Sequence, residues 1–489
     1  MSTSGILHRV ALGELPLLET KPWRDALRKN LLEGKRLVTL FGRRTDERVW
    51  ITAVLQAPDR SLLVSRTEVT VAVGYHELTT DIAALHCFER ELHEQTGVRV
   101  AAHPWLKPIR YEGNAPAMSE FPFYKIEGKE VHEVAVGPIH AGVIEPGSFR
   151  FMCLGEQVHH LEIQLGYQHR GVERRLLEGP PTRLSPLVET IAGDTSVAHA
   201  WAYAAAVESL GESELDTEVE MARAVALELE RVAMHLSTLS GMAADIGFLQ
   251  GASTYGRLRT TAINTTMRLC GSRFGRGAIR PGGIGMKLPA DLLIDLRANL
   301  ELLRRDLPII NECFLASQTV QHRLREVGVL TARQAAELGL VGVPARASGL
   351  PLDVRIGMKE GAYKVLPIGM ASSSHGDCWA RARVRIDEMD ASLEWISTVI
   401  ALFPNWNHPR KPLRALVPNH LVVSVVEGFR GEVVHCLETG EAGELVHYKV
   451  QDPSLRNWMG LAIAVRENEI SDFPICNKSF DLSYCGNDL

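Results

Sequence analysis

The chain has 489 residues, of which 45% are hydrophobic, and a formal net charge of -6. That length is enough for roughly two to three domains, and acids and bases are mixed throughout, so no charged block indicates a nucleic-acid-binding arm. The most apolar stretch, 191–210, is interrupted by Asp194, His199 and Glu208, and none reaches the roughly 18 to 20 apolar residues of a membrane span. We therefore expect no nucleic acid as a partner, no direct membrane span and, from the polar N-terminal residues, no secretory signal.

The first 115 residues have the pattern of a small α/β module. Three segments have the composition of strands, namely 36–41, 49–55 and 61–73. Apolar residues then recur at spacings of three and four and predict a helix over 80–95. A segment rich in proline, 104–123, follows and indicates a linker. These features predict a first domain over 1–115, a linker over 116–130 and a second domain over 131–489.

The second domain has the pattern of a mainly helical unit with small β-sheets near its start and its end. One apolar stripe from Met221 to Leu239 follows helical periodicity. Further helices are expected over 291–327, 384–402 and 455–466, with a glycine-rich loop region over 341–376. Strands are expected over 134–143, 149–154, 421–426 and 433–437. The predicted fold class of the whole chain is therefore α+β.

The eight cysteines are scattered and form no CxxC pair. In a long chain without a secretory signal, such cysteines are typical of reduced, mostly buried thiols and not of a disulfide framework.

Three segments carry a resemblance to a known family. They are Gly137–Phe151 followed by Gly166–Glu173, then Glu189–His199 followed by Ala202-Tyr203, and finally Asp452–Ser454 with Ser479–Gly486. In this order they resemble the large subunit of membrane-bound group 4 (energy-converting) nickel–iron hydrogenases and the 49 kDa subunit of respiratory complex I. The N-terminal module, with Ala84–Glu91, is similar to the 30 kDa subunit of complex I, fused in front.

The resemblance implies where a nickel–iron centre would be held. In the hydrogenases, two pairs of cysteines bind the metals, because thiolates hold nickel and iron tightly. Placed on this sequence, the four cysteine positions are Ala192, Thr195, Ser483 and Gly486. None of them offers a thiolate, and Cys485 lies one residue from the last position. We therefore expect no metal and no cofactor on this chain.

The resemblance also implies a cleft, for which the residues leave two interpretations open. Glu145 aligns with the glutamate that relays protons in the hydrogenases, but it is equally compatible with a loop carboxylate that caps a turn before Pro146. His140 aligns with a histidine of the same loop. The tyrosine that contacts quinone in complex I falls on Gly193, so that quinone chemistry does not carry over directly.

Three further features, two residues and one loop, each allow two interpretations. Arg430 matches an arginine beside the iron site, where it would donate to an anion, or it forms a salt bridge with Glu432 or Glu427. His199 faces the old cluster position, on a helix whose start Asp194 would cap, or it is a core histidine. The loop that begins at Arg346 resembles one near the cleft, or it is a surface turn.

The family implies a peripheral subunit on the cytoplasmic face of a prokaryotic inner (plasma) membrane. Its partners would be a small subunit with a [4Fe-4S] cluster and antiporter-like membrane subunits. We predict NAD(P)H- or ferredoxin-linked electron transfer toward quinone without a nickel–iron centre. The alternative is a coupling and assembly subunit of an ion-translocating complex through which no electrons pass, since fold does not determine function.

Overall fold

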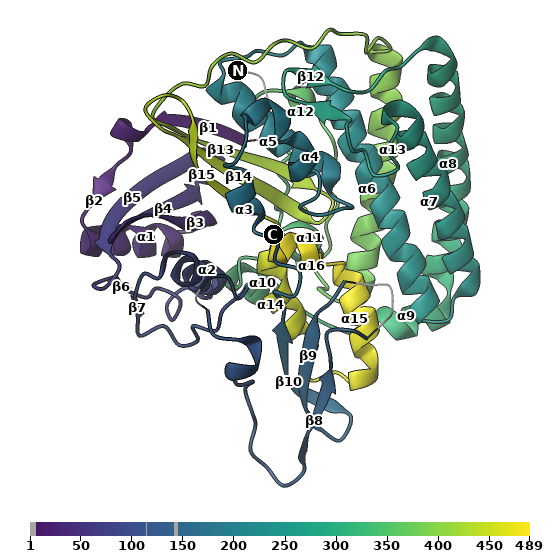
Figure 1. Ribbon diagram of the computed structural model, residues 1–489. Helices are drawn as coiled ribbons and strands as arrows, with labels where there is room; N and C mark the ends of the chain where they lie inside the picture. The colour runs from purple at the N-terminus through teal and green to yellow at the C-terminus, as the bar shows by residue number, and fades with distance from the viewer. Residues whose placement is uncertain (1–5, 114, 141–144) are drawn as a thin grey trace.

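The computed structural model describes residues 6–113, 115–140 and 145–489, and Figure 1 shows their arrangement. The mixture of long helices and small, mostly antiparallel sheets confirms the predicted α+β class. Residues 141–144, which belong to the first segment of the resemblance and to the end of the strand predicted over 134–143, lie outside the described residues.

The N-terminal part contains one four-stranded sheet in the order β2-β5-β4-β3. Its strands are β2 (Leu17–Leu18), β3 (Arg36–Thr45), β4 (Arg48–Gln56) and β5 (Leu62–Thr70), which confirms the three predicted strands. Helix α1 (Thr20–Leu32) was not predicted, and α2 (His86–Thr96) begins six residues later than expected because residues 83–85 form a 3-10 turn. Two short strands, β6 (Tyr75–His76) and β7 (Val100–Ala101), pair beside them.

A second four-stranded sheet combines the N-terminal strand with three strands from the C-terminal part of the chain. Its order is β1-β13-β14-β15, all antiparallel, with β1 (Ile6–Ala11), β13 (His420–Gly428), β14 (Gly431–Thr439) and β15 (Leu445–Gln451). Apolar side chains from β3 and β4 share one buried cluster with those of β13 and β14. The N-terminal strand thus pairs within the region predicted as the second domain; the proposed boundary itself stays a prediction.

Long helices form the largest layer, at the right of Figure 1. They are α6 (Thr217–Asp245), α7 (Leu249–Cys270), α8 (Ala290–Ala316) and α13 (Cys378–Leu402). Helix α6 contains the predicted apolar stripe, and α13 begins where the Asp377 side chain accepts a hydrogen bond from the backbone N–H of Ala380 (2.7 Å). The single helix expected over 291–327 is wrong, because Ser317 ends α8 and caps α9 (Gln318–Leu324).

Short helices connect these layers. They are α3 (Val172–Arg175), α4 (Ser185–Val188), α5 (Ser196–Leu210), α10 (Ala332–Glu337), α11 (Gly342–Ala347), α12 (Ala362–Val365), α14 (Ser454–Ala464), α15 (Phe473–Phe480) and α16 (Tyr484–Asp488). A three-stranded sheet of β8 (Val131–Val136), β9 (Ser148–Leu154) and β10 (Gln157–Gln164) projects below them, and β11 (Ile279–Arg280) pairs with β12 (Gly283–Ile284).

Candidate active site

The site is built where three segments, distant in sequence, meet. The loop before α5 carries Ala192 to Thr195, the tip of the β13–β14 hairpin carries Arg430, and the segment between α15 and α16 carries Asp481 and Ser483. Gly428 pairs with Gly431, so Phe429 and Arg430 form a two-residue turn that projects the arginine. The second and third segments of the resemblance therefore meet at Arg430.

Arg430 is the centre of the described contacts. Its Nη1 and Nη2 donate to the two carboxylate oxygens of Asp194 at 2.6 and 2.7 Å, and Nη1 also donates to the Thr195 hydroxyl at 3.0 Å. Its Nε donates to the backbone carbonyl of Asp481. Burial raises the pKa of the Asp194 carboxyl, but the Arg430 charge outweighs this effect and lowers it overall. A fixed, paired guanidinium therefore lies beside Thr195.

These contacts correct two predictions. Asp194 does not cap α5, since the N-cap residue is Thr195 and the Asp194 carboxylate is used by Arg430. The partner of Arg430 is likewise Asp194, not Glu427 or Glu432, which bind Arg346 and Arg36.

The other two positions implied for the metal ligands lie at the start of α16. The Ser483 hydroxyl accepts the backbone N–H of Gly486 at 2.9 Å, so it acts as a helix cap. A Cβ atom added at Gly486 would lie 2.6 Å from the carboxylate of Asp452, closer than real contacts allow. Ala192 is fully buried, and its carbonyl accepts the backbone N–H of Thr195 at 3.0 Å. Ser483, Gly486 and Ala192 are thus each engaged in hydrogen bonds or close packing within the chain.

Glu145 contacts the same helix start from the loop before β9. Its Oε2 accepts the backbone N–H groups of Tyr484 (3.1 Å) and Cys485 (3.4 Å). The Cys485 thiol contacts the Ser483 hydroxyl at 3.4 Å, and burial together with the Glu145 charge raises its pKa to about 12. Cys485 is therefore a protonated thiol at neutral pH. His140 does not join this group: it is exposed and packs edge-on against Phe149.

His199 lies behind the site in a buried chain of polar groups. Its ring nitrogens contact His435 Nε2 at 3.0 Å and Asp452 Oδ2 at 3.2 Å, and His435 Nδ1 contacts the Tyr448 hydroxyl at 2.8 Å. Burial lowers the pKa of His435, so its ring is neutral. Both ring nitrogens of His199 thus contact buried polar groups of the core.

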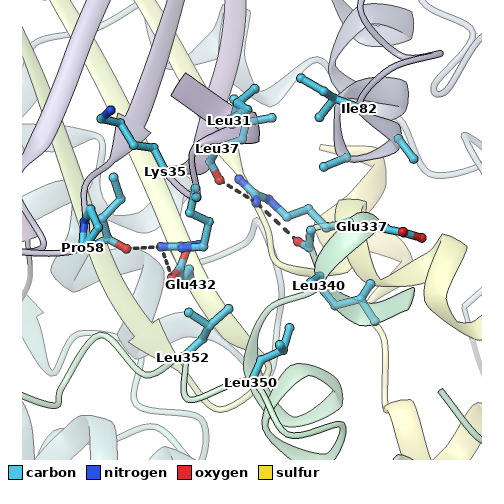
Figure 2. A pocket seen from close by; sticks show the side chains of 18 of the residues that line it. Leu31, Lys35, Leu37, Pro58, Ile82, Glu337, Leu340, Leu350, Leu352 and Glu432 are labelled. Atoms are coloured by element: carbon cyan, nitrogen blue, oxygen red, sulfur yellow. Dashed lines mark hydrogen bonds and ion pairs between the residues drawn. The ribbon is translucent and has the colours of Figure 1, made fainter. Parts of the chain in front are cut away.

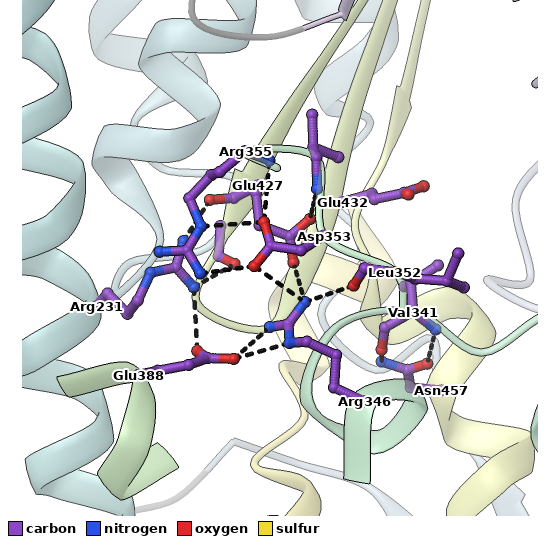
Figure 3. Close-up of polar contacts among 12 residues, drawn as sticks. Arg231, Val341, Arg346, Leu352, Asp353, Arg355, Glu388, Glu427, Glu432 and Asn457 are labelled. Carbon is purple, nitrogen blue, oxygen red and sulfur yellow. Dashed lines mark hydrogen bonds and ion pairs between the residues drawn. The ribbon is translucent and has the colours of Figure 1, made fainter. Parts of the chain in front are cut away.

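A larger polar cluster, shown in Figure 3, was missed by the sequence analysis. We call it the arginine cluster; it combines four carboxylates with three guanidiniums, all buried, from Glu228, Asp353, Glu388, Glu427, Arg231, Arg346 and Arg355. Arg346 is fully buried, so the surface turn was the wrong interpretation. Burial raises the pKa of Glu427 to about 7; the Arg346 charge opposes this rise and the nearby Asp353 adds to it. One carboxylate in excess of the guanidiniums agrees with a protonated Glu427.

No group of three or more His, Cys, Asp or Glu side chains that could hold a metal ion occurs among the residues that the structure describes. Within the same residues, no helix is both long and apolar enough to cross a membrane.

The comparisons with known proteins agree with one another. A family described as the respiratory-chain NADH dehydrogenase 49 kDa subunit matches residues 245–417. Formate hydrogenlyase subunit 5 of Escherichia coli (strain K12) is 29% identical over 368 residues, which cover 74% of this chain and 63% of that protein. The chain thus spans less than two thirds of that relative's length.

NADH-quinone oxidoreductase subunit 4 of Thermus thermophilus is 30% identical over 383 residues, covering 72% of this chain and 92% of that protein. A chain from the structure of an archaeal membrane-bound sulfane sulfur reductase superimposes with a TM-score of 0.68 at 22% identity, covering 75% of this chain and all of that one, which shows a shared fold. The geometry and these similarities together establish that the chain belongs to the family of the 49 kDa subunit of respiratory-chain NADH dehydrogenase.

Proposed function

We propose that this chain is a peripheral electron-transfer subunit of a membrane-bound, complex I-like oxidoreductase and that it has no nickel–iron centre of its own. The observation that carries the proposal is the occupation of the four implied ligand positions. Thr195 accepts from Arg430, Ser483 caps α16, and Gly486 leaves no room for a Cβ beside Asp452. A thiolate site needs four free sulfur ligands in a defined geometry, and these residues do not fit one.

The acceptor proposed for this complex is a quinone, bound near a [4Fe-4S] cluster of an iron–sulfur small subunit, with NAD(P)H or ferredoxin as the donor. Antiporter-like subunits would place the complex at the cytoplasmic face of a prokaryotic inner membrane. The name of one relative, NADH-quinone oxidoreductase subunit 4, supports quinone as the acceptor, and that of another, membrane-bound hydrogenase subunit alpha, supports a membrane-bound complex. The fused 30 kDa-like module remains part of the proposal.

The residues of this chain would act on the acceptor and its protons. The Asp194 side chain is 37% exposed and that of Asp481 is 29% exposed, so the Arg430 pair lies within reach of a polar acceptor. Glu145, held against the start of α16, is the group available to move a proton at its Oε1. Its carboxylate also neutralises part of the positive helix end.

The second candidate, a coupling and assembly subunit without electron transfer, is favoured by a different observation. Arg430 pairs with Asp194 and donates to Thr195 and to the backbone carbonyl of Asp481, so this one side chain links the hairpin tip to the loop before α5 and to the segment before α16. In that case the site would be a closed structural joint.

Two measurements on the complex purified from native membranes test the proposal. We expect no nickel, and iron only at the level of the partner's clusters; stoichiometric nickel would overturn it. We also expect Glu145→Gln to abolish quinone-dependent turnover, with Glu156→Gln, in the exposed turn between β9 and β10, as the matched control. Wild-type turnover in Glu145→Gln would remove Glu145 from the mechanism, and a wild-type complex without quinone reduction would favour the coupling role.

A further inference from the structure

A large cavity lies away from the candidate active site, between the N-terminal sheet and the segment around α10 and α11 (Figure 2). Its volume of about 810 Å³ is within the range of small-molecule sites, roughly 300–1,000 Å³. One wall comes from the end of α1, the adjacent ends of β3 and β4, and residues 80–84. The opposite wall comes from α10, residues 350–354 and the start of β14. The cavity therefore needs both parts of the chain.

The apolar surface of the cavity is aliphatic. In Figure 2, Leu37 and Ile82 lie across the cavity from Leu340, Leu350 and Leu352. Among the described lining residues there is no Phe, Tyr or Trp. Sites for planar rings usually supply aromatic faces for stacking. This lining instead suits a flexible alkyl chain, which gains affinity from buried area alone.

The lining carries four carboxylates and four cationic side chains, namely Asp81, Glu337, Asp353 and Glu432 with Lys35, Arg36, Arg60 and Arg456. Each of these carboxylates already contacts a guanidinium; Glu432, for example, accepts from Arg36 at 2.6 Å. Arg60 donates only to the backbone carbonyls of Asp353 and Val354, at 3.2 and 3.4 Å. Arg456 is buried and donates to backbone carbonyls and to the side-chain oxygen of Gln451. Neither forms an ion pair within 4.0 Å in the described part of the chain, whereas Lys35 and Arg36 pair with Glu33 and Glu432. Arg60 and Arg456 are therefore the two cations of the lining without a carboxylate partner.

We propose that this cavity binds an aliphatic amphiphile with one anionic head group, its chain between the two leucine-lined walls and its head group beside Arg60. The chemistry is that of a fatty carboxylate or of an acyl lipid with an anionic head group. A buried carboxylate requires a paired cation, and a half-buried arginine with free donor capacity supplies a planar, bidentate partner. The site is independent of the function proposed above.

The test is calorimetric titration of the detergent-free, full-length chain with sodium dodecanoate, sodium octanoate and dodecan-1-ol. We expect dodecanoate to bind about tenfold or more tightly than dodecan-1-ol, because only the former pairs with Arg60. Each methylene added between octanoate and dodecanoate should strengthen binding by about three- to fourfold. Competition by anionic phosphatidylglycerol vesicles, but not by phosphatidylcholine vesicles, would identify a membrane lipid as the source; no competition by either would identify a free carboxylate.

Two variants test whether the ligand binds in this cavity. Arg60→Gln removes the head-group partner and should weaken dodecanoate binding about tenfold without changing dodecan-1-ol binding. Ala336→Trp, on the exposed side of α10, should fill the cavity and abolish both. Arg48→Gln on β4 and Ala332→Trp on α10 lie outside the lining and should bind as wild type does. The proposal is overturned if the wild-type chain does not bind dodecanoate, or if both cavity variants bind it with unchanged affinity.

Discussion

Replacing Arg346 by methionine would remove the central charge of the arginine cluster. Arg346 is fully buried and pairs with Glu388 and Glu427, each at 2.7 Å, and it donates to the backbone carbonyl of Leu352 at 2.8 Å. Breaking a buried ion pair by removing one partner costs about 3–5 kcal/mol, because the remaining charge is left without compensation. We expect a loss of that size in the free energy of unfolding at pH 8.5.

The loss should be smaller at pH 6. Glu388 keeps contacts to Arg231 and His235, so Glu427 is the group left with an unpaired charge. The pKa of Glu427 is already about 7 with Arg346 present, and removing that cation raises it further. Glu427 is therefore neutral in the folded variant at pH 6, and the substitution leaves no unpaired charge there. The contribution of Glu427 to wild-type stability should fall as pH rises from about 4.5 to 7, since the folded state holds this proton more tightly than the unfolded state.

Equilibrium urea unfolding followed by circular dichroism at both pH values measures the effect. Arg333→Met is the matched control, because Arg333 is 85% exposed and its pair with Glu337 is of the kind worth only about 0.3–0.5 kcal/mol. If Arg346→Met does not fold, Arg346→Lys keeps a charge and should lose less. A loss below about 1 kcal/mol at pH 8.5, equal to that of the control, would refute the reasoning.

Three shorter predictions concern the candidate site. Gly486→Ala should lose about 1–3 kcal/mol of stability through overpacking against Asp452, whereas Gly369→Ala, which meets no atom within 4 Å, should not; equal urea midpoints would contradict this. Burial raises the pKa of Glu230 to about 8, so its contribution to the free energy of unfolding should fall as pH rises from about 4.5 to 8. The difference in stability between the wild type and Glu230→Gln should therefore change with pH over that range; a constant difference would contradict this. Cys485, whose thiol stays protonated, should react with iodoacetamide more slowly at pH 7.5 than the exposed Cys313, as peptide mass spectrometry would show.

Much of the fold could be predicted from local patterns. The strands β3 to β5 and the stripe of α6 followed from composition and periodicity, although β3, β4 and α6 are each buried on more than one face. Helix α7 and the pairing of β1 were not found. The partner of β1, beginning at His420, is far along the chain, and no local pattern specifies such a pairing.

The candidate site could be placed only in part. The segments of the resemblance located Thr195, Arg430 and Ser483, and the structure brings them together through Asp194 and the start of α16. The partner of Arg430 could not be deduced, because Asp194 is distant in the chain, whereas the nearby Glu427 and Glu432 pair with other arginines. The arginine cluster could not be predicted for the same reason: its charged residues are spread over α6, α11, the segment 353–355, α13 and β13. Buried arginine is also rare enough that each position is expected at the surface.

The pairing of β1 with β13 has a consequence for synthesis on the ribosome. Ala11 emerges early, but its partner His420 is added about 400 residues later, which takes on the order of 20 to 80 s at the usual elongation rates of about 5–20 residues per second. During that interval β1 has an unpaired edge and apolar residues without their cover. The sheet that contains β1 can therefore form only after β13 has been synthesised. A nascent chain released before residue 428 would keep its first strand available to chaperones or to other chains.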